Sequence, residues 1–505
     1  MKNEHATSAI VVDGTTVSEE GEDDAARASA PPSLLALVLV WSKDEPWRIG
    51  QVLLLPADTG ATVWIGRGAN SAGKPLKGTF GEQRPGQWAP SAAIRSQAIS
   101  RHQLSLSFHE SSGAHIAHNL GKCALFHNGR PVNECQIAAG DLLQLGKQLL
   151  FLCCRRPLQF PGEPGAFADF PFGQPDAHGI VGESPAVWRL RQQMMYVAAR
   201  SDHVIVTGRS GSGKELVAGA IHALSARAGR PIVARNAATL PETLIDAELY
   251  GNARNYPNPG MAERPGLIGE AHGSTFFLDE IAELPQTAQA HLLRVLDGGE
   301  YQRLGEARTR TSDFRLVAAT NRELSALKPD LLARLALELR VPDLDERRED
   351  VPLLVRHLLR QKAEQGDSVA LELFPDRDPR GEPQIPLSFM LRFLEHRYAM
   401  NVRELKSLLW EALSRSSSFA AEPLPDELRV ETPDSKPPES ALGVRVMAPD
   451  AAPSAERIQQ SLDENNGSIE RTWRALQLSS RFALVRLIKK YGLEVRKRPA
   501  RKSRA

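Results

Sequence analysis

The chain has 505 residues, of which 62 are basic and 61 acidic, so its formal net charge is only +1. This length suits roughly three or four domains with substantial cores. The balance of charge excludes attraction of the whole protein to nucleic acid, so any such contact needs a local patch. The four cysteines lack zinc-ligand spacing and are typical of reduced core residues in a cytoplasmic protein: Cys123, Cys135, Cys153 and Cys154.

Composition divides the first third of the chain. Residues 1–32 are polar, charged and rich in Ala and Pro, which predicts a disordered segment. In residues 33–156, short β-type runs alternate with Gly, Pro and Asn turns, which is typical of an all-β sandwich or barrel. The run from Leu34 to Trp41 is too short to cross a bilayer and indicates a strand, so no membrane contact is expected. Residues 157–178 are rich in Pro, Gly and Phe, and predict a linker between two independent domains.

Residues 179–345 alternate strand and helix signals, which predicts a parallel α/β sheet. Inside this region the stretch VIVTGRSGSGKE fits the pattern of a phosphate-binding loop. Gly208, Gly211 and Gly213 allow positive φ, so that backbone amides point at an anion, and Lys214 adds a fixed positive charge. The alternative is a Gly-rich turn between a strand and a helix, with no ligand.

A second motif argues against the simple turn. Thr275 begins TFFLDE, a buried-strand run that ends in the carboxylates Asp279 and Glu280. Such a pair suits Mg²⁺ binding through water and polarisation of an attacking water. The two motifs in this order predict an ATPase.

The rest of the chain has three further divisions and a tail. A helical region covers residues 346–420, a Pro-rich linker covers 421–453, and a short helical domain covers 454–494. The tail, residues 495–505, is strongly basic. These divisions predict a multidomain protein with β, α/β and all-α parts.

Further motifs follow the phosphate-binding loop in a fixed order: NAATLPETLIDAELYG (236–251), GSTFFLDEIAELP (273–285), HLLRVLDGGEYQRLG (291–305), LVAATNREL (316–324) and DERREDVPLL (345–354). The region from Gly179 to about Ser414 resembles the AAA+ domains of sigma-54-dependent transcriptional activators, the NtrC-like enhancer-binding proteins. The resemblance implies a P-loop AAA+ core with a helical lid, and it explains Glu215, which this family carries after the P-loop lysine.

The resemblance also implies roles for single residues. Lys214 would hold the β- and γ-phosphates of ATP, Asp279 the magnesium, and Glu280 would polarise water. Four other positions match family residues: Asn236, which restrains the catalytic Glu; Asn321, a γ-phosphate sensor; Arg403, the sensor arginine of the lid; and Arg334, an arginine finger for the neighbouring subunit. A finger that acts on a neighbour implies a hexameric or heptameric ring.

Two positions depart from the family pattern. Lys328 stands where the family has a second arginine, and it keeps the charge but loses the bidentate fork, which predicts slow turnover. Residues 255–260 read NYPNPG where activators carry GAFTGA, the element that engages sigma-54. Pro257 and Pro259 stiffen the loop and the Phe-Thr pair is absent, so sigma-54 engagement is predicted to be altered or lost, with Tyr256 as a substitute aromatic.

The β-region carries IGRG at 65–68, ISRHQ at 99–103 and HNGRPV at 127–132. It resembles a forkhead-associated (FHA) domain, a β-sandwich that binds phosphothreonine peptides. The resemblance implies that Arg67, Ser100 and Arg101 contact the phosphate, which suits guanidinium and hydroxyl donors. The family's histidine after that serine is matched only by His102, next to Gln103, and its Asn-Gly is replaced near residues 122–124, where Lys122 adds a charge. The alternative is a sandwich used only for docking.

Near the C-terminus, residues 455–494 fit two helices, a turn and a third helix, and resemble the Fis-type helix-turn-helix of these activators. The resemblance implies a DNA-binding domain with four basic contact residues: Arg481, Arg486, Lys489 and Lys490. The alternative is an amphipathic hairpin without DNA contact. The basic tail would add salt-sensitive affinity.

Together these patterns predict a cytoplasmic transcription regulator that uses ATP and Mg²⁺. Its expected partners are an enhancer-like DNA site, the sigma-54 RNA polymerase holoenzyme, and a phosphothreonine protein or Ser/Thr kinase. One alternative is a DNA-binding regulator whose ATPase is an oligomerisation switch that never engages sigma-54. Another is a phosphopeptide-binding adaptor with a vestigial ATPase.

Overall fold

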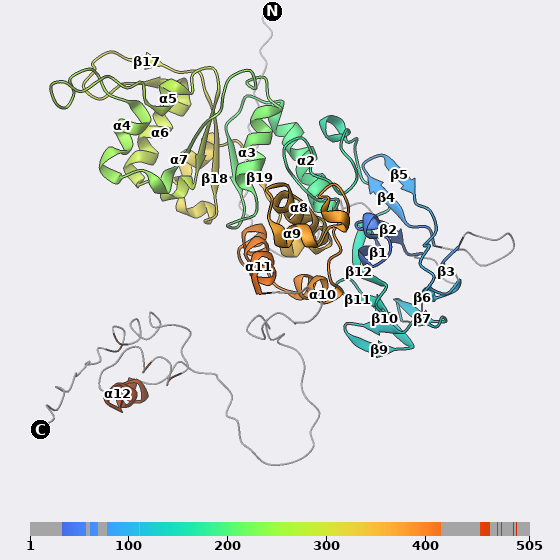
Figure 1. Ribbon diagram of the computed structural model, residues 1–505. Coiled ribbons are helices and arrows are strands. Elements are labelled where there is room, and N and C mark those ends of the chain that lie inside the picture. The colour runs from blue at the N-terminus through green and yellow to red at the C-terminus, as the bar shows by residue number, and fades with distance from the viewer. Residues whose placement is uncertain are drawn as a thin grey trace, which may run out of the picture. The chain divides into compact units, whose positions relative to one another are not determined.

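The computed structural model describes residues 33–56, 61–68, 78–110, 112–415 and 455–464, together with Thr472, Leu476, Ile488 and Tyr491. The chain divides into two compact units between Val430 and Glu431. The first unit holds a β-sandwich, an α/β domain and a helical lid (Figure 1). Among the described helices, none is both long and apolar enough to cross a membrane.

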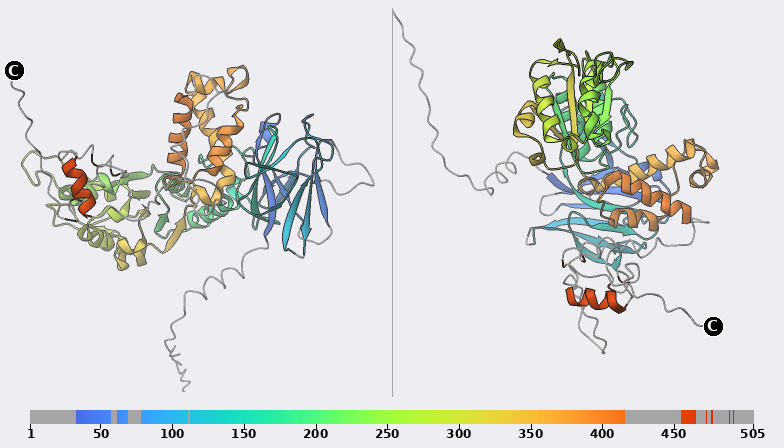
Figure 2. Two further views of the ribbon diagram at one scale, coloured as in Figure 1. Left: turned by 90° about the horizontal axis from the view of Figure 1, so that it is seen from below. Right: turned by 90° about the vertical axis from the view of Figure 1, so that its left-hand side faces the viewer.

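The N-terminal part is a sandwich of two antiparallel sheets (Figure 2). The eight-stranded sheet has the order β5-β4-β2-β1-β12-β11-β8-β9, and the four-stranded sheet the order β10-β7-β6-β3. Apolar side chains of both sheets, such as Leu37 and Leu106, form one buried cluster between them. The prediction of an all-β domain is therefore confirmed. The strands are β1 Ser33–Ser42, β2 Val52–Leu54, β3 Thr62–Ile65, β4 Gly81–Arg84, β5 Gln87–Pro90, β6 Leu104–His109, β7 Ala114–Asn119, β8 Leu125–His127, β9 Arg130–Val132, β10 Glu134–Ile137, β11 Leu142–Leu145 and β12 Leu149–Pro157.

The α/β domain has a five-stranded parallel sheet with the order β14-β15-β18-β13-β19. Side chains alternate between its faces: Val204 and Val206 pack with α2 and α3, and Ile205 packs with α4 to α7. Both faces are thus covered, as the apolar strands require. The elements are α2 Pro185–Ala198, β13 Val204–Thr207, α3 Lys214–Ala223, β14 Val233–Asn236, α4 Ile245–Tyr250, α5 Gly266–Glu270, β15 Thr275–Asp279, α6 Gln286–Gly298, β16 Glu300–Tyr301, β17 Arg310–Thr311, β18 Arg315–Thr320, α7 Pro329–Arg334 and β19 Leu337–Arg340.

The lid is a cluster of four helices, orange in Figure 1. These are α8 Val351–Glu364, α9 Ser368–Glu372, α10 Leu387–Glu395 and α11 Asn401–Arg415. The apolar side chains of the lid share one buried cluster with the outer face of the large β-sheet, including Val38, Val40 and Leu150. Trp41 Nε1 donates to Ile385 O of the lid at 2.7 Å. The sandwich and the lid therefore form a common core.

This common core differs from the expected pair of independent domains. The linker at 157–178 is also packed, because Phe160 and Phe167 are buried with α2 and the α/β sheet. The sequence shows no helical or strand period in this segment, so its phenylalanines gave no sign of burial. Each phenylalanine packs singly, because the regular structure of this segment is a short 3-10 turn at Gly165–Phe167.

In the second unit the structure describes one helix, α12 Ala455–Glu464. Ile458 and Leu462 are buried on one face, and the Thr472 hydroxyl donates to Ser461 O at 3.4 Å. These observations agree with the first helix of the predicted small helical domain.

Candidate functional site

The glycine loop takes the geometry of a phosphate cradle. Gly213 has φ of 107° and caps the N-terminus of α3, so that free amides of the first helical turn face the loop. Gly211 has φ of 74°, and a Cβ there would lie 2.2 Å from Met400 O of the lid. Only glycine fits this approach, and the loop is therefore held against the lid helix α11.

Lys214 is the first residue of α3 and its side chain is buried. Its Nζ donates to Gly208 O at 2.9 Å and to Arg209 O at 3.3 Å. Burial lowers the pKa of Lys214, while the nearby charges of Glu280 and Asp279 act in the opposite direction. The lysine thus lies in the field of both carboxylates.

Parallel register brings the two carboxylates and an amide to one edge of the sheet. Asn236 ends β14 directly beside Asp279, which ends β15. Asn236 Nδ2 donates to Asp279 Oδ2 at 3.3 Å, so the amide contacts this carboxylate and not that of Glu280. Glu280 has φ of 52°, an uncommon conformation for a residue with a side chain. Its buried Oε2 has no hydrogen-bond partner among the described residues.

Residues of the lid also contact the glycine loop. Arg403 Nη1 donates to Ser210 Oγ at 2.8 Å. Two residues that the sequence analysis did not single out also hold the loop. The buried Asn401 donates from Nδ2 to Ser210 O at 3.2 Å and accepts from Leu344 N at 2.7 Å, and Arg347 Nη2 donates to Ser212 O at 3.4 Å. The polar start of NVREL was the available signal for Asn401.

These groups surround one cavity of about 620 Å³. The predicted residues that line it are Gly211, Gly213, Lys214, Glu215, Asp279, Glu280 and Arg403. Its walls also include the apolar residues Ile180, Val181, Leu354 and Leu358. A polar cradle beside an apolar wall is the arrangement that a nucleotide needs.

Four residues predicted for the ATP site lie outside the lining of this cavity: Gly208, Asn236, Asn321 and Arg334. Asn321 follows β18, the neighbour of β13, and is exposed. Arg334 ends α7, where its Nε lies 2.5 Å from Asp297 Oδ1 and its side chain is 54% exposed. The Arg334 guanidinium is therefore exposed, and pairs with Asp297 away from the cavity of its own chain. Lys328 caps the start of the same helix.

Comparison with known proteins agrees with this geometry. Residues 180–341 match the sigma-54 interaction domain. The chain is 32% identical over 327 residues to the regulatory protein AtoC of Escherichia coli, covering 62% of this chain and 68% of that protein. The chain belongs to the family of AAA+ regulators with a sigma-54 interaction domain.

Other members of this family are similar over shorter shares of their length. The Nif-specific regulatory protein of Bradyrhizobium diazoefficiens is 33% identical over 359 residues, which cover 64% of this chain and 62% of that one. The Nif-specific regulatory protein of Azotobacter vinelandii is 40% identical over 238 residues, which cover 46% of this chain and 43% of that one. The chain thus spans less than two thirds of either Nif-specific protein.

Within the sigma-54 interaction domain, the loop that carries NYPNPG is closed by its own contacts. The buried Asn252 donates from Nδ2 to the carbonyls of Ala253, Tyr256 and Ala262 at 3.0 to 3.2 Å. Asn255 Oδ1 accepts from Gly260 N at 2.9 Å. The Tyr256 ring lies against Gly305 of the neighbouring loop, although 43% of the residue stays exposed. The loop is thus held by its own hydrogen bonds and exposes part of the Tyr256 ring.

The candidate phosphate site of the β-sandwich joins three loops. Arg67 N donates to Ser100 O at 3.1 Å, and Lys122 N donates to Ser100 Oγ at 3.1 Å. The buried Arg67 Nε has no hydrogen-bond partner among the described residues, and Arg101 is exposed. The predicted residues Arg67 and Ser100 are thus adjacent through the backbone, and Lys122 joins them.

His102 and its neighbour Gln103 take different positions at this site. His102 is exposed, with its ring edge-on to Trp64 at 5.5 Å. Gln103 is fully buried and ties the loops together: its Oε1 accepts from Ser100 N at 3.1 Å, and its Nε2 donates to Asn119 Oδ1 at 2.7 Å and Cys123 O at 2.8 Å. The inward position belongs to Gln103, which comes directly before β6, whereas Arg101 and His102 in the preceding bend are both exposed.

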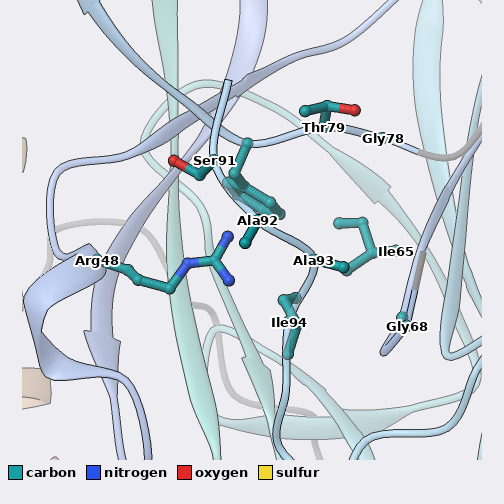
Figure 3. Close-up of a pocket in the computed structure, with 11 residues that line it drawn as sticks. Arg48, Ile65, Gly68, Gly78, Thr79, Ser91, Ala92, Ala93 and Ile94 are labelled. Carbon is teal, nitrogen blue, oxygen red and sulfur yellow. The ribbon is translucent and has the colours of Figure 1, made fainter. Parts of the chain in front are cut away.

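A separate cavity of about 210 Å³ lies in the same sandwich (Figure 3). The Arg48 guanidinium points toward the segment from Ala92 to Ile94. Arg48 is already paired, with Gln51 Oε1 at 2.9 Å and Glu45 Oε1 at 3.3 Å. The positive charge that Arg48 brings to this cavity is therefore already neutralised by Glu45.

The candidate DNA-contact residues Arg481, Arg486, Lys489 and Lys490 lie outside the described residues. Only α12 of the predicted helix-turn-helix region is described as a complete helix.

Proposed function

We propose that this protein is an ATP-hydrolysing transcription regulator that works as a ring of identical subunits. The observation that carries the proposal is the single cavity where the P-loop, the Asp279–Glu280 pair and the lid residue Arg403 meet. In the reaction, Lys214 would bind the β- and γ-phosphates, Glu280 would orient and polarise the attacking water, and Arg334 would stabilise the transition state in the neighbouring subunit.

The residues at the sheet edge suit magnesium. Asp279 lines the cavity beside the phosphate cradle and offers the hard oxygen ligands that Mg²⁺ prefers, while the unpartnered Glu280 Oε2 is left for the attacking water. Bound there with ATP, the ion would neutralise charge on the phosphates. Asp279 would hold it, and Asn236 would orient that carboxylate through the 3.3 Å hydrogen bond.

The test is Glu280→Gln. Removing the carboxylate should leave ATP affinity within about twofold and lower hydrolysis at least about a hundredfold, since the base contributes roughly 10²–10⁴. The matched control is Glu283→Gln, a change three residues on in a side chain that pairs with Arg322 at 2.6 Å and does not line the cavity. Hydrolysis that survives in Glu280→Gln would contradict the catalytic role.

We also propose that the β-sandwich binds phosphothreonine peptides and that the C-terminal domain binds DNA. The first proposal is supported by the adjacency of Arg67, Ser100 and Lys122 and by the orphaned Arg67 Nε, which suits an anion. The second is supported by the basic residues of the C-terminal region.

A second candidate is a regulator that hydrolyses ATP but does not engage sigma-54. The closed NYPNPG loop favours it, because Pro257 and Asn258 replace the Phe-Thr pair of the family motif. The deciding experiment is a native gel of the protein, trapped with ADP and a metal-fluoride mimic of the γ-phosphate, with purified sigma-54. A stable complex supports an activator of the usual kind, and its absence alongside measured hydrolysis supports the second candidate.

A further inference from the structure

The apolar wall of the nucleotide cavity continues into a segment that the β-sandwich contacts. Ile180 and Val181 line the cavity. Two residues further on, Glu183 is 1% exposed, and its carboxylate accepts from Trp188 Nε1 at 2.9 Å and from Gly173 N at 2.8 Å. A carboxylate buried this deeply needs a cation.

The cation is Arg84, at the end of β4 of the sandwich. It makes a two-pronged contact with Glu183, Nε to Oε2 at 3.2 Å and Nη2 to Oε1 at 2.5 Å. Its Nη1 donates to Phe170 O at 2.8 Å, and its guanidinium lies 4.2 Å from the centre of the Phe170 ring. The linker therefore helps to hold the arginine that neutralises Glu183.

A second arginine of the sandwich holds the backbone at the same point. Arg156, on β12, is 1% exposed; its Nη1 donates to Glu183 O at 3.1 Å, and its Nη2 lies 3.1 Å from Glu349 Oε1. On the opposite side, Asp350 Oδ1 accepts from Glu183 N at 2.7 Å. Both backbone polar atoms of Glu183 are therefore fixed by groups that belong to other elements.

The contact of Arg156 with Glu349 also connects the sandwich to the P-loop, through Arg347. Glu349 and Asp350 follow Arg347 closely, and the buried Arg347 donates to Ser212 O of the glycine loop at 3.4 Å. Burial lowers the pKa of Arg347, and the nearby charge of Asp350 acts in the opposite direction. One short segment thus joins Arg156 of the sandwich to the phosphate cradle.

We propose that the β-sandwich is a working part of the nucleotide site, with Arg156 and Arg84 as positioning residues. They fix the wall at Ile180 and Val181, and Arg156 also fixes the segment that carries Arg347. This inference rests on the proposed ATP-binding function. On this inference the sandwich holds the wall of the nucleotide site in place. A ligand that shifts β4 or β12 would then change the affinity of the site for nucleotide.

The experiment compares full-length wild type with the double variant Arg156→Met/Glu349→Gln, which removes both charges and keeps the volume. Each protein is titrated with ADP and assayed for ATP turnover, and its folding is monitored by circular dichroism. We expect KM for ATP and the Kd for ADP to rise at least about fivefold, with kcat within about twofold, because the lost contacts act on binding alone. The single variant Arg156→Lys, which keeps the positive charge, should bind ADP more tightly than the double variant. The control is Arg155→Met, a neighbouring exposed arginine on β12.

The outcomes separate the hypotheses. A folded double variant with lower thermal stability and unchanged KM would overturn the inference and leave Arg156 a purely structural residue. If the double variant does not fold, Arg84→Lys decides: it keeps the charge but loses the two-pronged contact, so an unchanged KM would likewise overturn the inference. Wild-type protein that binds no ADP would refute the proposed function itself, which is a different result from equal binding by wild type and variants.

Discussion

The two candidate anion sites of this protein are built in different ways. In the AAA+ domain, the cradle is made mainly from backbone, with glycines of positive φ and the free amides at the start of α3, and one buried lysine adds a charge. In the β-sandwich, the candidate site depends on the side chains of Arg67, Ser100 and Arg101, which stand on loops. The first site is fixed by the path of the chain, and the second by how separate loops are tied together.

This difference predicts different sensitivities to substitution. A backbone cradle should tolerate the loss of most side chains around it and fail only where a charge is deleted. A side-chain site should weaken with each donor removed, because each contributes directly to the phosphate contact. The predictions below test this contrast, first at the cradle and then at the sandwich.

The largest effect is expected for Lys214→Ala. Loss of a charge-assisted contact to phosphate should raise the Kd for ATP by about 10- to 100-fold. The comparison variant is Ser212→Ala, in the same loop: its buried hydroxyl has no hydrogen-bond partner among the described residues, so affinity should stay within about twofold if amides do the binding. Titration calorimetry measures both, and equal losses would show that the cradle depends on side chains after all.

A smaller effect is expected at the sandwich for Arg67→Ala. Affinity for a phosphothreonine peptide should fall at least about tenfold, since a guanidinium contact to a dianion is lost. Arg155→Ala is the control, because this exposed arginine donates only to Ser33 O among its described partners, at 3.4 Å. Fluorescence anisotropy with phosphorylated and unphosphorylated peptides gives the answer. Equal binding of both peptides by the wild type would reduce the sandwich to a docking domain.

The same contrast explains how much could be predicted from the sequence. Glycine spacing, an apolar strand and two carboxylates were enough to place Lys214, Asp279 and Glu280 at one cavity, because parallel strands end at a common edge. Asn401 and Arg347 were missed, since the polar start of NVREL and the charged run before α8 do not by themselves show that these residues contact the P-loop. The contacts of Arg84 with Glu183 and of Arg156 with Glu349 join residues 99 and 193 positions apart, which periodicity cannot reveal.

The histidine position in the β-sandwich shows the same limit at short range. Arg101 and His102 lie in a bend before β6 and are both exposed, whereas the next residue, Gln103, is buried, so one position decides which side chain ties the loops. The family's histidine was matched only by His102, next to Gln103, and of these two side chains the buried one is Gln103. Its amide provides both a donor and acceptors, as the loops require.

The smallest effect on binding is expected for Gln103→Ala. The change leaves the partly buried amides of Ser100 and Cys123 without their acceptor, at up to about 1 kcal/mol for each lost hydrogen bond, so the loops should loosen. Hydrogen exchange at these amides should speed up, while peptide affinity falls only a few fold, because Arg67 and Ser100 keep their side chains. His102→Ala, on the exposed neighbour, should change neither quantity. If Gln103→Ala instead weakened peptide binding as much as Arg67→Ala, the loop backbone would define this site too, and the contrast with the P-loop would disappear.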